Sequence, residues 1–227
     1  MNADGGNQKQ LTIDAGANYS PTVSPDGHYI VFCSRRAGSP NIWRMDIDGS
    51  NPKRLTSGSN DNWPRCSPDG KWVFYSGQSF GKPMVSRVPI DGGDSVRLSE
   101  KFMGIPSISP DGKLVACSYI NEQQPESPEK LALVSSEQGE IVKAFDRPPN
   151  ASYLYGWTTN GRAVMYIVTR NGISNIWSQP IDGGPPRQLT DFNSDQIFQF
   201  EWSRDGKTLL CSRGVESSDI VLISNFK

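Results

Sequence analysis

The sequence lacks an excess of charge of either sign, because 23 lysines and arginines stand against 24 aspartates and glutamates. A chain without a field of one sign is a poor partner for nucleic acid or an anionic membrane surface. It also lacks any apolar run near the roughly 20 residues that a membrane-spanning helix needs. Its apolar runs, such as residues 131–134, have the length of a strand. We therefore expect no nucleic-acid partner and no insertion into a membrane.

Few residues suited to metal or redox chemistry are present. The chain has one histidine, His28, and four cysteines without any CxxC spacing: Cys33, Cys66, Cys117 and Cys211. Metal and redox sites usually show such paired ligands. Residues 1–10 contain no basic region followed by an apolar stretch, which a secretory signal needs. We expect no metal, no cofactor and no signal or transmembrane segment in these 227 residues.

What the sequence does have is a repeat. The tetrapeptide Ser-Pro-Asp-Gly or a relaxed form of it ends at glycines 27, 70, 112, 161 and 206, at intervals of 42 to 49 residues. Each copy is followed by a β-branched or aromatic segment, then by a second segment ending in a turn such as Asp-Ile-Asp-Gly, and in most copies by a short Leu-Thr or Leu-Ser segment. Four short strands per repeat, separated by turn residues, are typical of a propeller blade.

The turn chemistry supports a structural role for these tetrapeptides. Proline presets φ at the first turn position, aspartate bonds the local backbone, and glycine takes the position with positive φ. No window shows helical spacing of apolar residues, and 22 glycines with 17 prolines would interrupt one. The sequence predicts an all-β fold: a five-bladed β-propeller of four-stranded antiparallel blades, a single domain over residues 1–227, with blades at about 19–56, 62–99, 104–145, 153–190 and 197–225.

The two ends of the sequence predict how the ring closes. Residues 1–12 align without a gap with residues 45–56, so the chain begins inside a repeat, and residues 219–225 align with a third strand. The last repeat therefore lacks the strand that residues 7–12 offer, and we expect the N-terminal strand to complete the last blade and leave no open edge. The alternative is that the chain is the last part of a longer propeller.

The repeat resembles the bacterial WD40-like PD40 repeats of the TolB type. The pattern stands most clearly in residues 20–56, where a short strand, SPDG, an aromatic strand, NIW, a DG turn and LT follow one another, and it recurs over nearly the whole chain. The third and fourth repeats depart from it. The resemblance implies a propeller used in envelope machinery, as a sensor or docking domain of bacterial kinases and regulators, or beside a serine peptidase. A periplasmic or extracytoplasmic location follows from the resemblance, whereas the unpaired cysteines favour the cytoplasm.

Candidate catalytic residues do not fit their motifs. Residues 77–81 read GxSxG, but no helix is expected after Ser79, which the nucleophile elbow of a hydrolase requires. His28 follows a turn at a position that other repeats fill with lysine or arginine, so we expect it at the surface. A Ser-His-Asp triad is therefore disfavoured, and we expect no enzyme.

The cysteines occupy packing positions. Cys33, Cys117 and Cys211 fall on the same second-strand position of three repeats, too far apart around a ring for a disulfide. Cys66 shares an apolar first-strand column with Val23, Ile108, Trp157 and Trp202, which we expect to pack between blades.

Binding residues are expected where the first strands and their leading loops approach the axis, since these positions vary while the scaffold does not. Aromatic and arginine side chains there carry the most binding energy. The candidates are Tyr19, Asn62, Trp63, Arg65, Tyr153, Tyr155, Gln199 and Glu201. The polar loop 121–130 could also serve as a docking loop for a partner, but its composition favours a solvated insertion.

We therefore expect a monomeric, non-catalytic binding module that takes a protein, peptide or envelope ligand in its axial funnel, within a larger signalling protein. The alternatives are a substrate-gating propeller of a serine peptidase and a TolB-like envelope component.

Overall fold

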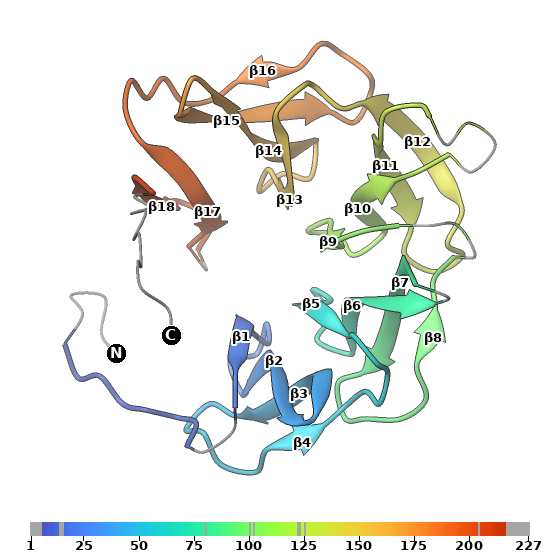
Figure 1. The fold of residues 1–227 in the computed structure, drawn as a ribbon, viewed down its shortest axis with the longest axis vertical. Coiled ribbons are helices and arrows are strands. Elements are labelled where there is room, and N and C mark those ends of the chain that lie inside the picture. The colour runs from blue at the N-terminus through green and yellow to red at the C-terminus, as the bar shows by residue number, and fades with distance from the viewer. Residues whose placement is uncertain are drawn as a thin grey trace, which may run out of the picture.

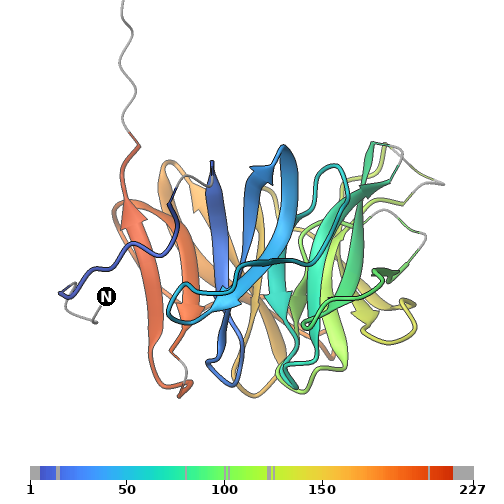
Figure 2. The same ribbon diagram turned by 90° about the horizontal axis from the view of Figure 1, so that it is seen from below.

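The computed structural model describes residues 6–13, 16–79, 81–99, 101, 103–121, 124, 126–203 and 205–216. These residues form strands β1 to β18 and no helix, so none of them belongs to a helix that could cross a membrane. The strands form sheets that are arranged radially about a central axis (Figure 1), and in side view the individual strands run roughly along that axis (Figure 2).

Four sheets have four strands each and follow the order of the sequence. Blade 1 contains β1 (Asn18–Val23), β2 (Tyr29–Ala37), β3 (Ser39–Asp46) and β4 (Lys53–Arg54). Blade 2 contains β5 (Asn62–Cys66), β6 (Trp72–Ser79), β7 (Lys82–Pro89) and β8 (Val96–Arg97). Blade 3 contains β9 (Ser107–Ile108), β10 (Leu114–Tyr119), β11 (Lys130–Ser135) and β12 (Ile141–Asp146). Blade 4 contains β13 (Ala151–Trp157), β14 (Ala163–Arg170), β15 (Ile173–Pro180) and β16 (Arg187–Gln188).

A fifth unit consists of β17 (Gln196–Trp202) and β18 (Leu209–Gly214). All strand pairs are antiparallel. The first strand of each unit (β1, β5, β9, β13 and β17) lies nearest the centre of the ring in Figure 1, and the fourth strands lie at its outer edge. This arrangement confirms the predicted β-propeller of four-stranded antiparallel blades.

The predicted count of five blades is not confirmed, because four blades are complete and the fifth unit has two described strands. The third strand expected at residues 219–225 lies outside the described residues. The closing strand expected at residues 7–12 is not a strand here: residues 6–13 have no strand assignment, and Lys9 instead donates to the carbonyl oxygen of Asp48 at 2.9 Å.

The apolar core is divided among the interfaces between consecutive blades. One cluster joins blades 1 and 2 around Val31 and Val73, a second joins blades 2 and 3 around Phe74 and Val115, and a third joins blades 3 and 4 around Leu133. A fourth lies between blade 4 and β17–β18. Because strand side chains alternate between the two faces, blades 2, 3 and 4 each pack against both neighbours, whereas these clusters join blade 1 to blade 2 alone and β17–β18 to blade 4 alone.

The Ser-Pro-Asp-Gly turns connect first and second strands through one repeated set of hydrogen bonds. Ser24 Oγ donates to Asp26 Oδ1 at 2.5 Å and accepts from the backbone N–H of Tyr29 at 2.9 Å, while Asp26 Oδ1 accepts from the N–H of His28. The same bonds recur at Ser67, Ser109 and Ser203, and Thr158 with Asn160 replaces the pair in blade 4. The predicted structural role of these aspartates is consistent with this arrangement.

These turns predict how stability depends on pH. The serine hydroxyl, together with the backbone N–H, lowers the pKa of the turn carboxylates Asp26, Asp69, Asp111 and Asp205. A carboxylate whose pKa is lower in the folded state stabilises the fold above its unfolded pKa, about 4, and this contribution is lost as the pH falls through the folded pKa.

Replacing all four aspartates with asparagine, which blade 4 already carries at Asn160, should therefore reduce the loss of unfolding free energy between about pH 4 and pH 2. Urea unfolding measured across that range checks this. An unchanged acid slope in the fourfold variant would show that these carboxylates do not carry the effect.

Candidate functional site

An axial cavity of about 540 Å³ lies where the five first strands meet. One residue from each first strand lines it at the same position of the repeat, counted back five residues from the turn glycine. We call these residues the axial ring: Thr22, Arg65, Ser107, Gly156 and Glu201. Turn residues such as Pro25, Pro110 and Asp205 also line the cavity. The cavity therefore opens along the axis toward the end of the ring that carries the Ser-Pro-Asp-Gly turns.

Two charged side chains face this cavity from the axial ring. The guanidinium of Arg65 donates from Nη1 to the carbonyl oxygen of Pro64 at 3.0 Å, and it forms no ion pair with a described carboxylate. Burial lowers the pKa of Arg65, and the negative charge of Glu201 opposes that shift. Because the group titrates so far above neutral pH, it remains charged. Arg65 and Glu201 thus place opposite charges on the cavity wall.

Aromatic side chains form a large part of the apolar wall. The indole of Trp157 donates from Nε1 to the carbonyl oxygen of Ser107 at 3.0 Å, and that of Trp202 donates to Trp157 at 2.9 Å. Each tryptophan therefore bonds to the first strand of the preceding blade. Phe200 packs over Gly156, where a Cβ atom would come within 2.6 Å of the ring. The sequence assigned Trp157 and Trp202 only to packing between blades, and the structure places them in the cavity wall as well.

β-Bulges reshape the first strands near the axis. The register shifts in β1, β5, β13 and β17, and in the first two the bulge contains a non-glycine residue with positive φ, Ser20 at 51° and Trp63 at 56°. Positive φ is costly for a bulky residue such as tryptophan. Bulges re-aim side chains and occur often beside functional sites. Trp63, in the bulge of β5, is 37% exposed.

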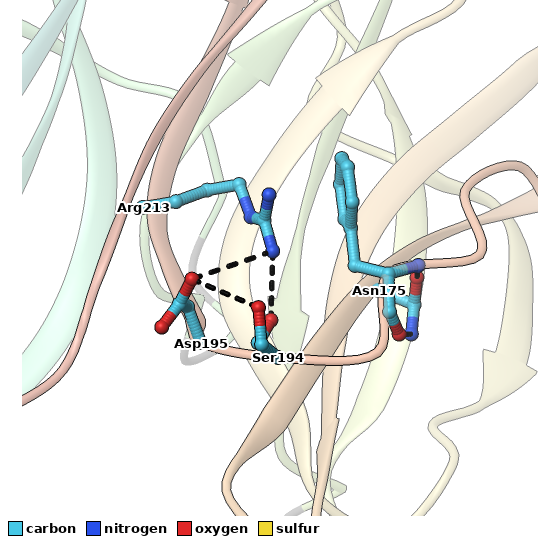
Figure 3. Close-up of polar contacts among 5 residues, drawn as sticks. Asn175, Ser194, Asp195 and Arg213 are labelled. Carbon is cyan, nitrogen blue, oxygen red and sulfur yellow. Dashed lines mark hydrogen bonds and ion pairs between the residues drawn. The ribbon is translucent and has the colours of Figure 1, made fainter.

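The loop that leads into β17 is fixed on both sides (Figure 3). Asn175 of β15 accepts from the backbone N–H of Phe192 at 2.7 Å. From β18, Arg213 donates to the carbonyl oxygen of Ser194 at 2.7 Å and forms an ion pair with Asp195 at 3.8 Å. Asn41, at the matching position of blade 1, donates to Gly58 at 2.6 Å and so fixes the loop into β5. The Asn of the repeated Asn-Ile-Trp segment therefore positions the strands that carry Arg65 and Glu201.

The structure brings four of the eight predicted binding residues into the axial cavity: Arg65, Tyr155, Gln199 and Glu201. Tyr155 is buried, its hydroxyl has no described hydrogen-bond partner, and burial raises its pKa. The other four lie outside the lining. Tyr19 donates to Asn62 Oδ1 at 2.8 Å, joining blades 1 and 2, while Trp63 and Tyr153 are exposed, Tyr153 beneath the guanidinium of Arg147.

The structure also places the serine, the histidine and the cysteines that the sequence offered as candidates for chemistry. Ser79 ends β6, which continues into the antiparallel strand β7 and not into a helix. His28 is exposed. The four cysteines are free, with Cys33 and Cys117 buried, and burial raises the pKa of Cys66 and Cys117 to about 12, which makes their thiols poor nucleophiles. One packing assignment was wrong: Val23 is 53% exposed, because no apolar cluster of the described residues joins blade 1 to β17–β18.

Metal ligands do not gather elsewhere in the part of the chain that the structure describes, where no three His, Cys, Asp or Glu side chains form a group that could hold an ion. The polar loop at 121–130 lies between β10 and β11, and several of its residues lie outside the described part.

Comparison with known proteins gives one family match. The model of the TolB beta propeller domain, PD40, matches residues 1–146. Among curated proteins, an uncharacterized protein of Agrobacterium fabrum is 41% identical over 63 residues, which are 28% of this chain and 22% of that protein. The Tol-Pal system protein TolB of Bordetella pertussis is 36% identical over 47 residues, 21% of this chain and 11% of that protein. The chain thus spans less than a quarter of the length of these relatives.

Solved structures share the architecture. TolB from Acinetobacter baumannii superposes with a TM-score of 0.65 at 27% identity, over 76% of this chain and 43% of that chain. An oligogalacturonate lyase from Vibrio parahaemolyticus reaches 0.65 at 15% identity, over 88% and 60%. The second likeness shows the fold alone, and it means that the propeller by itself does not separate enzymes from binding proteins.

Proposed function

Because the chain belongs to the family of TolB beta propeller domains, PD40, we propose that it is a non-catalytic binding module that holds a polypeptide segment of another protein in its axial cavity. The observation that carries the proposal is the axial ring, in which each of the five first strands contributes one lining residue of different chemistry. The structural positions of the repeat keep their residue types, whereas the axial ring reads Thr, Arg, Ser, Gly and Glu.

The dimensions and chemistry of the cavity support this proposal. Its volume of about 540 Å³ falls within the range of roughly 300–1,000 Å³ typical of ligand pockets. Aromatic and arginine side chains in such partly desolvated positions supply most of the binding energy in protein interfaces. Trp157, Trp202 and Arg65 have these properties here.

The matches to TolB proteins favour one of the alternatives, a component related to the Tol-Pal system. In this version the polypeptide ligand belongs to another protein of the envelope. We also propose that the chain acts as a monomeric single propeller domain, attached to or part of a larger protein.

The proposal includes the five-bladed ring, and the N-terminal segment supports it. Lys53 of β4 donates to the carbonyl oxygen of Asp91 in the next blade at 2.5 Å, and Lys143 of β12 donates to Ile181 in the next blade at 3.1 Å. Lys9, which aligns with Lys53, donates in the same way to Asp48 of blade 1. These matching contacts support the proposal that residues 7–12 act as the fourth strand of a blade preceding blade 1, and the segment lies on the side of blade 1 that faces β17–β18 (Figure 1).

Selection of random peptides on the immobilised chain, followed by affinity measurement, tests the binding function. We expect Arg65→Gln to weaken the selected peptides at least about tenfold, which corresponds to about 1.4 kcal/mol. The matched control is Arg87→Gln, because Arg87 is also half-buried but lines a separate cavity of about 550 Å³ between blades 2 and 3. Peptides that bind Arg65→Gln as tightly as the unchanged chain, or a selection that enriches none, would contradict the proposal.

A further inference from the structure

The axial ring contains two charged residues, and neither forms an ion pair with a residue that the structure describes. Arg65 comes from β5 and Glu201 from β17, two strands on either side of β1 in the ring. Arg65 uses one donor on the carbonyl oxygen of Pro64. Glu201 forms no ion pair or hydrogen bond with a described side chain, although its charge acts on Arg65. Among the described residues, the cavity thus holds a cation and an anion that form no ion pair, although the charge of Glu201 affects the pKa of Arg65.

The third charged group in the lining is already engaged. Asp205 accepts from the hydroxyl of Ser203 at 2.7 Å and from the backbone N–H of Lys207 at 3.1 Å. These bonds belong to the turn and recur in the other blades, so Asp205 is committed to the scaffold. Glu201 is therefore the carboxylate that is available to a ligand.

We propose that the axial cavity selects a peptide segment carrying a carboxylate and a basic group close together, with Arg65 binding the carboxylate and Glu201 the basic group. This inference rests on the proposed function and specifies its ligand. A guanidinium binds a carboxylate through two parallel N–H donors, a geometry that an amide ligand cannot reproduce.

The apolar walls increase the selectivity. Trp157, Phe200 and Trp202 line the cavity beside the two charges. Arg65 is half-buried, so its charge interacts more strongly with a ligand than a fully exposed charge would. A ligand with one charge would leave the opposite wall charge without a partner and so would lose that part of the binding energy. A ligand with both charges pairs with both wall charges, so Arg65 and Glu201 each add a preference of their own to the affinity.

Four acetylated and amidated tripeptides form the test: Lys-Ala-Glu, Lys-Ala-Gln, Gln-Ala-Glu and Gln-Ala-Gln, titrated into the chain and followed through the indole signals of Trp157 and Trp202. We expect Lys-Ala-Glu to bind at least tenfold more tightly than either singly charged peptide. With Arg65→Gln, the preference for Glu over Gln in the peptide should disappear while the preference for Lys remains, and Glu201→Gln should give the reverse.

Equal binding of Lys-Ala-Glu and Gln-Ala-Glu would overturn the inference and indicate a simple anion site at Arg65. Absence of binding by all four peptides at millimolar concentration would also overturn it. The peptides selected for the proposed function separate the two failures: if they bind in the axial cavity but carry no acidic and basic pair, the proposed function stands and this inference falls.

Discussion

Gly139→Ala is expected to lower the free energy of unfolding by roughly 3 kcal/mol or more, an effect of the size seen when a packed interior is overfilled. Gly139 belongs to the turn between β11 and β12, with φ at +73°, and a Cβ atom there would overlap the backbone carbonyl oxygen of Leu98 in blade 2. The backbone of Leu98 cannot swing aside as a side-chain end would, since its N–H donates to Val85 at 2.9 Å. The substitution therefore acts on the interface between blades 2 and 3.

Gly172→Ala is the matched control for this prediction. Gly172 has φ at +78°, nearly the same backbone conformation, but no atom lies within 4 Å of its Cβ position. We expect it to cost about 1 kcal/mol, the cost of left-handed backbone in a residue with a side chain. Urea unfolding of both variants gives the comparison. Equal losses would mean that the blade interface is looser than the structure shows.

Leu11→Ser is expected to lower the free energy of unfolding by about 1 to 2 kcal/mol, the scale of partly burying a leucine. Leu11 packs over Gly49, where a Cβ atom would come within 3.2 Å of its side chain. Leu55 and Leu98, which occupy the corresponding place after the third strands of blades 1 and 2, are both 6% exposed. If residues 7–12 act as the fourth strand of the last blade, Leu11 has the same structural function.

Ile13→Ser provides the control in the same segment, because Ile13 is apolar but 74% exposed. It should change the free energy of unfolding by less than about 0.5 kcal/mol. Urea unfolding of the two variants under one set of conditions gives the two free energies of unfolding to be compared. A Leu11→Ser variant as stable as Ile13→Ser would show that the segment does not contribute to the ring, and would count against closure through the N-terminus.

The strand pattern and turns could be predicted from the sequence because they depend on local chemistry. Ser24 and Asp26 form hydrogen bonds within their own turn, so the tetrapeptide alone is enough to predict the turn. Second-strand cysteines such as Cys117 could be assigned to packing because equivalent residues of a repeat have equivalent surroundings. Arg65 and Glu201 could be predicted as binding residues because they stand at a position near the axis where every repeat has a different residue.

Other features depend on contacts between repeats, and such contacts cannot be predicted by aligning the repeats with one another. Trp157 was assigned to packing alone, since its place in the cavity wall follows from the rotation between blades. Asn62 was expected to contact the ligand, but its amide oxygen accepts a hydrogen bond from the hydroxyl of Tyr19 in the preceding blade. The blade count could not be settled by repeat spacing, because it depends on a pairing between the two ends of the chain.

The central claim, that a polypeptide binds in the axial cavity, is tested most directly by the indole N–H signals of the chain labelled with ¹⁵N-tryptophan while a selected peptide is titrated. Trp157 and Trp202 donate their indole N–H groups beside the cavity, whereas Trp72 lines the separate cavity between blades 2 and 3. The account predicts shifts at Trp157 and Trp202 with Trp72 unchanged. Shifts confined to Trp72, with the axial signals unmoved at saturation, would contradict it.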